Sequence, residues 1–332
     1  MLNKSLNKKI FDKDVEQIPI RKGYGEGLLA AGEADERVVA LCADLTESTQ
    51  TLAFAKKFPT RFIEIGVAEQ NLASVASGMA AMGKIPFITS YATFSPGRNW
   101  EQIRTTICYN DRPVKIIGSH AGVSVGPDGG THQATEDIAI TRVLPNMVVI
   151  SPCDAIEARK ATLAIAQTKA PTYLRLIREK TPVITTDATP FEIGKAQVFF
   201  ESEKPDVLIV ATGALVHKAL VAAHELAEKG IGGKKIAATV INLATIKPLD
   251  EETIVAHAKK AGAVVTVEEH QVHGGMGSAV AECLAKNCPV PIEFDGVHNK
   301  FGQSGTPDEL IKHYGMDVPD VVKAAEKVVG RK

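Results

Sequence analysis

RFIEIGVAEQNLASVASGMAAMGKIPFITSY, residues 61–91, contains two apolar, β-branched runs separated by a helical segment. Residues 61–66 and 85–91 have the composition of short strands. Residues 68–82 are almost wholly small or apolar, which predicts a helix packed on several sides, because Ala, Ser and Gly let other backbones approach closely. The stretch therefore predicts a strand–helix–strand unit, in which a crossover helix joins two parallel strands.

The same alternation continues along the chain. The β-branched runs before Arg178 are residues 37–44, 61–66, 85–91, 114–120, 147–152 and 172–177. Helices are expected at residues 68–82, 97–109 and 154–168. Alternating strands and helices are typical of βαβ units. We therefore predict an α/β protein of two domains, each with a mainly parallel sheet that helices cover on both faces.

A break in the pattern divides the chain. Residues 179–194, EKTPVITTDATPFEIG, are rich in Thr and Pro and show no helical period, which favours an interdomain linker. A second series then follows, with strands expected at 206–214, 235–243, 263–270 and 290–297, and helices at 215–229, 250–260, 277–286, 307–314 and 318–329. The predicted organisation is an N-terminal extension (1–17), a first domain (18–180), the linker (181–192) and a second domain (193–332).

The composition is that of an ordinary globular protein, with 332 residues, 45% hydrophobic and 23% charged. A net charge of -1 gives no basic excess for a nucleic acid or an acidic membrane surface, so neither partner is expected. No apolar run approaches the roughly 20 residues of a membrane span, and residues 1–17 lack the apolar core of a signal peptide, so a cytoplasmic location is expected. The five cysteines form no CxxC pair, which favours buried thiols over disulfides or zinc.

Functional side chains follow several of the predicted strands. In an open parallel sheet, ligands bind beyond the carboxyl ends of the strands. The side chains in that position are Asp44, Glu69, Tyr91, Phe94 and His120. Glu69 has two interpretations: it complements the dipole at the start of its helix, worth up to about 1 kcal/mol, or it is a buried functional carboxylate.

The most unusual segment is SHAGVSVGPDGGTHQATED, residues 119–137. His120 and His132 flank Asp128, and the glycines around Asp128 permit the positive φ and close backbone approach of a ligand-binding loop. The alternative is a plain surface turn that leads into a capped helix. The histidines have no regular metal-ligand spacing, so no metal-binding residue is predicted in this chain.

Two further groups have ambiguous patterns. Tyr91, Phe94 and Trp100 form either an aromatic platform for a flat heterocycle or part of the core. Arg21 and Arg178 could each hold a phosphate ester through a planar guanidinium, although a lone arginine more often forms a surface salt bridge. Taken one at a time, these patterns leave the function open.

The order of the motifs is more specific than any one of them. VVALCADLTEST, RFIEIGVAEQNLASVASGMAAMG, YATFSPGRNWEQIR, GVSVGPDGGTHQATEDIA and MVVISPCDAIEA together closely resemble the C-terminal half of transketolase, over residues 18–329. That half contains the pyrimidine-binding domain and the small C-terminal domain of a thiamine diphosphate enzyme. The resemblance implies a transferase of the pentose phosphate pathway, which moves a two-carbon ketol unit from a ketose phosphate to an aldose phosphate.

The resemblance also implies a role for each candidate residue. Glu69 would hydrogen-bond the aminopyrimidine of the cofactor and support removal of the thiazolium C2 proton, so it is both catalytic and cofactor-binding. Cofactor contacts are also implied for Tyr91, Phe94, Trp100 and Asp44. Sugar contacts are implied for Arg21, His120, Asp128, His132 and Arg178, with catalytic roles for the two histidines.

One motif of the family is absent: the sequence has no GDG with a following Asn, the pattern that binds Mg2+ and the diphosphate. The chain is therefore expected to be the C-terminal subunit of a split transketolase, with Mg2+ and the diphosphate of thiamine diphosphate held mainly by an N-terminal subunit. A heterotetramer of two subunits of each kind is expected, with homodimerisation of this chain. The alternatives are the β subunit of a 2-oxoacid dehydrogenase E1 component, a 1-deoxyxylulose-5-phosphate synthase, and a non-catalytic scaffold.

Overall fold

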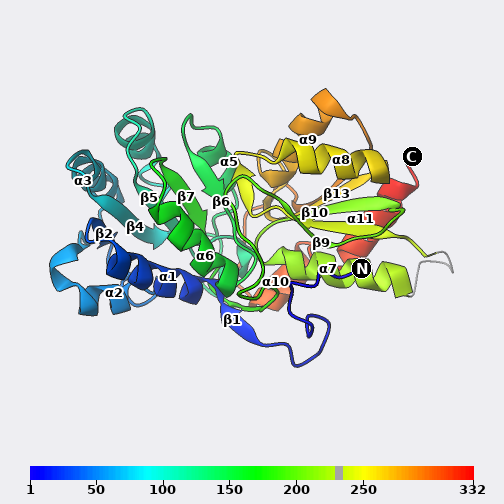
Figure 1. Ribbon diagram of the computed structural model, residues 1–332, viewed down its shortest axis with the longest axis horizontal. Helices are drawn as coiled ribbons and strands as arrows, with labels where there is room; N and C mark the ends of the chain where they lie inside the picture. The colour runs from blue at the N-terminus through cyan, green and yellow to red at the C-terminus, as the bar shows by residue number, and fades with distance from the viewer. Residues whose placement is uncertain (229–234) are drawn as a thin grey trace.

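The computed structural model describes residues 1–228 and 235–332, and Figure 1 shows two α/β units side by side along the long axis of the molecule. Each unit has a central, mainly parallel sheet flanked by helices. The predicted α/β class and the two domains with mainly parallel sheets are therefore confirmed.

The first sheet has seven strands in the order β12-β6-β7-β5-β4-β2-β3. Neighbouring strands are parallel except for β12, which is antiparallel to β6. Val38 and Ala40 of β2 face one apolar core, whereas Val39 and Leu41 face another, so both faces of the sheet are buried. The strands are β2 (Val38–Cys42), β3 (Phe62–Glu64), β4 (Ile85–Tyr91), β5 (Lys115–Ser119), β6 (Val148–Ile150), β7 (Thr172–Arg175) and β12 (Thr245–Lys247).

Different helices cover the two faces of this sheet. On one face, α1 (Ile20–Ala34) packs against α6 (Ala155–Ala166). On the other face, α3 (Glu69–Ala81) buries Leu72 and Ala76. The shorter helical segments of this domain are α2 (Leu52–Lys57), α4 (Trp100–Gln102), α5 (Asp137–Arg142), the 3-10 turns η1 (Pro59–Arg61) and η3 (Val123–Val125), and the π-helix η2 (Ile103–Cys108).

The second sheet has five strands in the order β14-β13-β10-β11-β9, with β9 antiparallel to β11. The strands are β9 (Gln197–Phe200), β10 (Val207–Ala211), β11 (Ala238–Asn242), β13 (Val264–Gln271) and β14 (Ile292–Val297). The helices are α7 (Leu215–Glu228), α8 (Glu251–Ala261), α9 (Met276–Asn287), α10 (Pro307–His313) and α11 (Val318–Val329). Residue 229, expected at the end of the helix 215–229, lies outside the described residues.

Three segments join the two domains more closely than the sequence pattern suggests. β12 follows the second domain's β11 in the chain but extends the first sheet. Residues 1–16 pack on the second domain beside α7 (Figure 1), where Leu6 and Ile10 enter the core. β1 (Gln17–Pro19) pairs with β8 (Lys180–Pro182), so the predicted linker begins in a strand.

The helix expected at 97–109 forms only in part. Residues 92–99 make turns around Pro96 and Gly97, and the helical path starts at α4 and continues as a π-helix. The five thiols are free, and all are buried except that of Cys288, which is partly exposed. In the part of the chain that the structure describes, no helix is both long and apolar enough to cross a membrane.

Candidate active site

Glu69 begins α3 at the carboxyl edge of the first sheet, just after β3 ends. Gly66 makes the turn between strand and helix with a φ of 79°, a conformation that favours glycine. The Glu64 carboxylate accepts hydrogen bonds from the backbone N–H of Gly66 at 2.9 Å and of Asp44 at 2.7 Å. This carboxylate therefore holds the exposed Asp44 next to the turn that leads into α3.

The Glu69 side chain is only 4% exposed, and its carboxylate faces Arg98. Arg98 Nη1 lies 3.3 Å from Oε2 and 3.4 Å from Oε1 of Glu69. A hollow of about 510 Å³ opens beside this pair, lined by Val67, Ala68, Glu69, Gln70, Asn71 and Arg98. A buried carboxylate at the edge of an open hollow is placed to meet a ligand that fills the hollow.

Four rings gather at the carboxyl edge of the same sheet. The rings of Tyr91 and His120 are stacked, with centroids 3.9 Å apart and an interplanar angle of 25°. Phe94 lies 6.1 Å from Tyr91 in a near-parallel orientation, and its ring meets His132 at 5.4 Å, edge to face. The cluster thus joins the end of β4, the turn after it and the loop 119–137, and it offers flat surfaces to a planar heterocycle.

His120 is a neutral imidazole in this site. It follows β5 with a φ of 57°, and its Nδ1 shares a hydrogen bond of 2.9 Å with Ser119 Oγ. Burial lowers the pKa of His120 to about 3, and the positive charges of Arg21 and Arg178 act in the same direction. At physiological pH the ring therefore exchanges hydrogen bonds without carrying a charge.

This shift predicts a pH dependence of stability. The folded protein protonates His120 near pH 3 and the unfolded chain near pH 6.5, so the folded state loses stability as the pH falls below 6.5. We expect His120→Gln to remove about 1.4 kcal/mol per pH unit of this loss, or about 2 kcal/mol at pH 5. Urea unfolding of both proteins at pH 7 and pH 5 measures the difference. An identical loss in the two proteins would contradict a buried neutral His120.

Two arginines stand beside His120. Arg21, near the start of α1, donates from Nε to the carbonyl of Arg178 at 3.1 Å and from Nη1 to the carbonyl of Ser48. Burial lowers the pKa of Arg21, and the neighbouring Arg178 charge adds to this effect. Arg178 donates to the Val125 carbonyl at 2.8 Å and lies 3.7 Å from Asp128. Two guanidinium groups at such close quarters repel each other, and an anion bound between them would relieve the repulsion.

The second domain holds the loop 119–137 in place. Ser124 N–H donates to Glu269 Oε1 at 2.6 Å, and the Gln133 side chain donates to the carbonyls of Val123 at 2.9 Å and Gln303 at 3.0 Å. A Cβ added to Gly130 would lie 2.6 Å from the Gly302 carbonyl oxygen. The loop that carries the predicted sugar-binding residues is therefore shaped by contacts with both domains.

Not every predicted residue joins the cluster. The Trp100 indole N–H donates to the Ile140 carbonyl at 2.6 Å and its ring packs on the core, so it anchors α4 to α5. Two neighbours of the cluster were missed: Ser48, whose carbonyl accepts from Arg21, and Arg98. Arg98 follows a Pro-Gly turn rather than a strand, and the rule of strand ends therefore did not select it.

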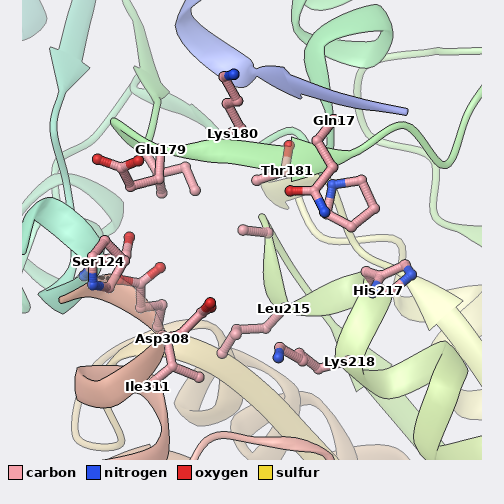
Figure 2. A pocket seen from close by; sticks show the side chains of 15 residues that line it. Gln17, Ser124, Glu179, Lys180, Thr181, Leu215, His217, Lys218, Asp308 and Ile311 are labelled. Atoms are coloured by element: carbon pink, nitrogen blue, oxygen red, sulfur yellow. Dashed lines mark hydrogen bonds between the residues drawn. The ribbon is translucent and has the colours of Figure 1, made fainter. Parts of the chain in front are cut away.

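A second hollow of about 290 Å³ lies between the two domains. Figure 2 shows Ser124, Glu179 and Asp308 along one side and Gln17 and His217 along the other. None of the predicted site residues lines this hollow. It is therefore a feature separate from the cluster around Glu69.

Comparison with known proteins identifies the family. The model of the transketolase pyrimidine binding domain matches residues 16–183, and that of the transketolase C-terminal domain matches residues 194–321. A putative transketolase C-terminal section of Methanocaldococcus jannaschii is 46% identical over 92% of this chain and 94% of that protein. The 6-deoxy-6-sulfo-D-fructose transketolase subunit SqwH of Clostridium sp. strain MSTE9 is 42% identical over 97% of this chain and 98% of that protein.

A solved structure agrees with these relatives. It is described as a split gene transketolase, inactive beta4 tetramer, and it is 44% identical with a TM-score of 0.86, over 94% of this chain and 99% of that chain. Fold and site together define a protein of the thiamine diphosphate-dependent class with a pyrimidine-binding domain. The chain belongs to the transketolase family and is similar to its separate C-terminal sections, which confirms the resemblance that the sequence motifs indicated.

Proposed function

We propose that this chain is the C-terminal subunit of a two-subunit transketolase, which transfers a two-carbon ketol unit from a ketose phosphate to an aldose phosphate. One observation carries the proposal: a buried carboxylate, a cluster of flat rings and a pair of guanidinium groups lie together at the carboxyl edge of one parallel sheet. The side chains that make up this arrangement are Glu69, Tyr91, Phe94, His120, His132, Arg21 and Arg178.

The residues present fit the pyrimidine end of thiamine diphosphate. When bound, this cofactor supplies a nucleophilic carbon and an electron sink for the two-carbon fragment. Glu69 would hold a proton against a ring nitrogen of the aminopyrimidine, and Tyr91 and Phe94 would pack against the ring faces. Asp44 stands next to the turn into α3, where it would contact the same ring. Trp100 would be a third aromatic contact, held in position by the hydrogen bond from its indole N–H to the Ile140 carbonyl.

The diphosphate and Mg2+ are assigned in this proposal to the N-terminal subunit. Among the residues that the structure describes, there is no group of three His, Cys, Asp or Glu side chains that could hold a metal ion. The assignment itself rests on the sequence, which has no GDG motif.

The sugar would lie between the rings and the two arginines. His120 and His132 would exchange hydrogen bonds or protons with its hydroxyls, and Asp128 would accept a hydrogen bond from another hydroxyl. Arg21 and Arg178 would hold the anionic end of the sugar, since a planar guanidinium pairs with phosphate through two parallel N–H groups. The name of the Clostridium relative refers to a sulfonated sugar, and a sulfonate is an anionic group that the same two guanidinium groups could hold.

Arg178→Ala should raise KM for phosphorylated sugars about tenfold or more, because a charge-assisted hydrogen bond is worth about 1.5–3 kcal/mol. KM for unphosphorylated sugars should change much less. Steady-state kinetics with both classes of donor in the assembled enzyme measure the two effects. Lys180→Ala removes a neighbouring exposed positive charge and is the matched control. Equal changes in KM for both classes of sugar would show that Arg178 does not bind the phosphate.

Exposed apolar side chains near α3 favour the binding of a partner subunit. Four large apolar side chains of the first domain are highly exposed: Val67 (68%), Met82 (84%), Tyr109 (86%) and Val143 (67%). Gly78, on the same helix, has open space where a side chain would be. Val67 lines the hollow next to Glu69 and Met82 follows the other end of α3, so exposed apolar groups at both ends of this helix favour an interface along it. We propose that the N-terminal subunit and a second copy of this chain cover this surface in a heterotetramer, located in the cytoplasm.

The experiment that tests the proposal is an assay of this chain alone and mixed with a diphosphate-binding subunit that carries a GDG motif. The assay contains thiamine diphosphate, Mg2+, xylulose 5-phosphate and ribose 5-phosphate. We expect activity in the mixture only. A stable complex that is inactive with these sugars but active with a sulfonated ketose would show that the donor is a sulfonated sugar and not a sugar phosphate. Activity with a 2-oxoacid instead would favour the dehydrogenase alternative, and activity of this chain alone would overturn the split enzyme.

A further inference from the structure

Arg98 already makes the two contacts that the proposed function assigns to the aminopyrimidine. Its guanidinium carbon lies 4.1 Å from the centroid of the Phe94 ring. Its Nη1 lies 3.3 Å and 3.4 Å from the two carboxylate oxygens of Glu69. A flat group that lies over an aromatic ring while one of its nitrogens faces a carboxyl group could be a guanidinium or an aminopyrimidine. The two groups therefore compete for the same surface.

We infer that Arg98 is an internal competitor of the cofactor, which occupies Glu69 and Phe94 until the aminopyrimidine displaces it. This inference rests on the proposed function. Arg98 then has two roles: it compensates the charge of a buried carboxylate, and it sets a threshold for cofactor binding. The guanidinium must leave Glu69 before an aminopyrimidine nitrogen can take its place.

The contacts of Arg98 suit a group that is displaced easily. Glu69 is 4% exposed, so an unpaired charge there would be costly, and a cationic partner is needed. The Arg98 side chain is 52% exposed, and both of its contacts with Glu69 are at the long end of the hydrogen-bond range. Such a pair is weak, since solvent screens it and no second donor fixes its geometry. The hollow beside the pair gives the side chain room to move.

The first test is cofactor affinity in the assembled enzyme, measured by equilibrium binding rather than by turnover. We expect Arg98→Gln to lower the apparent Kd for thiamine diphosphate about 3- to 10-fold, because the binding-competent arrangement no longer has to be reached by breaking the pair. Binding of inorganic pyrophosphate should be unchanged, since pyrophosphate has no ring to place at Glu69. Equal or weaker binding of thiamine diphosphate by the variant would overturn the inference.

Arg37→Gln is the matched control. Arg37 also pairs with a carboxylate, Asp35, at 2.7 Å, but on the surface and after the end of α1. Its replacement should leave both affinities as they are. A gain of affinity in both variants would reflect net charge rather than competition at Glu69, and it would also overturn the inference.

The second test uses this chain alone and does not depend on cofactor binding. Arg98→Gln leaves Glu69 without a positively charged partner and should lower the midpoint of thermal unfolding by about 2–4 °C. Glu69→Gln should restore most of that loss in the Arg98→Gln background, so the double-mutant cycle should show coupling. Additive effects of the two substitutions would show that Arg98 and Glu69 do not interact, and they would overturn the inference. Failure of every assembled form to bind thiamine diphosphate would instead overturn the proposed function, and the competition with it, whatever the cycle shows.

Discussion

Glu69→Ala is expected to lower kcat of the assembled enzyme by about 10²- to 10⁴-fold, which is the usual contribution of a positioned proton-transfer group. The carboxylate is buried at the start of α3, beside the rings of the candidate site, and the described residues around it include no second acid that bonds to Arg98. Removing it takes away the group that would share a proton with the aminopyrimidine. Steady-state kinetics at saturating cofactor measure the loss.

Two controls separate this role from a structural one. Glu69→Gln keeps the shape and one hydrogen-bond acceptor, but it cannot exchange a proton, so it should be nearly as inactive as Glu69→Ala. Size-exclusion chromatography should show that both variants still assemble with the N-terminal subunit. Turnover near the wild-type rate in either variant would sink the proton-transfer role. A loss of assembly would instead make Glu69 an interface residue.

The first domain was largely predictable because its strands and helices have different sequence patterns. The helix expected at 68–82 forms over Glu69–Ala81, and the strand expected at 85–91 forms over Ile85–Tyr91. Helix α1 was not predicted, since four glycines weaken its helical pattern. Those glycines are needed by packing: a Cβ on Gly23 would lie 1.8 Å from the Ala155 carbonyl oxygen of α6. Close packing against α6 thus explains why α1 forms a helix despite its low helix propensity.

Connections between the domains were the hardest feature to predict. Thr245–Lys247 has the composition of any short strand, and nothing in it says that it extends the other domain's sheet. The N-terminal residues look like a polar extension because few of them are apolar: Leu6 and Ile10 are buried in the core of the second domain, and Leu2 and Phe11 pack at its edge. Both cases depend on distant partners, and sequence periodicity carries no information about such partners.

Candidate site residues were predictable where they follow strands. Tyr91 and His120 end or follow neighbouring parallel strands, and the structure stacks their rings. Arg98 and Ser48 lie in turns several residues beyond a strand, where the path of the chain decides what they meet. The physical limit is the same in both cases: a strand fixes the direction of its last side chains, and a turn does not.

Arg175→Ala is expected to destabilise the chain by about 3–5 kcal/mol, because it leaves a buried carboxylate without its cation. Arg175 is 3% exposed and Asp137 is 1% exposed, and Arg175 Nε donates to Asp137 Oδ2 at 2.9 Å. Burial acts to lower the pKa of Arg175, but Asp137, Glu269 and Tyr173 together outweigh burial and raise that pKa. Tyr173 adds a hydrogen bond of 2.6 Å to the same Asp137 oxygen.

The pair also connects the two domains at the end of the loop 119–137. Arg175 ends β7 and donates from Nη2 to the Glu269 carbonyl at 2.7 Å, while Asp137 is the first residue of α5. Breaking it should therefore loosen the loop that carries His120 and His132. We expect KM for the sugars to rise in the variant at temperatures where it remains folded.

Thermal unfolding of the isolated chain measures the effect on stability, and a fall in midpoint on the order of 10 °C is expected from a loss of this size. Arg159→Ala removes another ion pair, with Asp187, whose side chains are 38% and 83% exposed, and it should cost less than about 1 kcal/mol. Arg175→Lys keeps a positive charge but loses the second donor, so its unfolding midpoint should lie between those of Arg175→Ala and Arg159→Ala. Similar midpoints for Arg175→Ala and Arg159→Ala would show that the buried pair adds no stability. The same loss in Asp137→Asn would support it, because that substitution leaves Arg175 buried without its counter-ion.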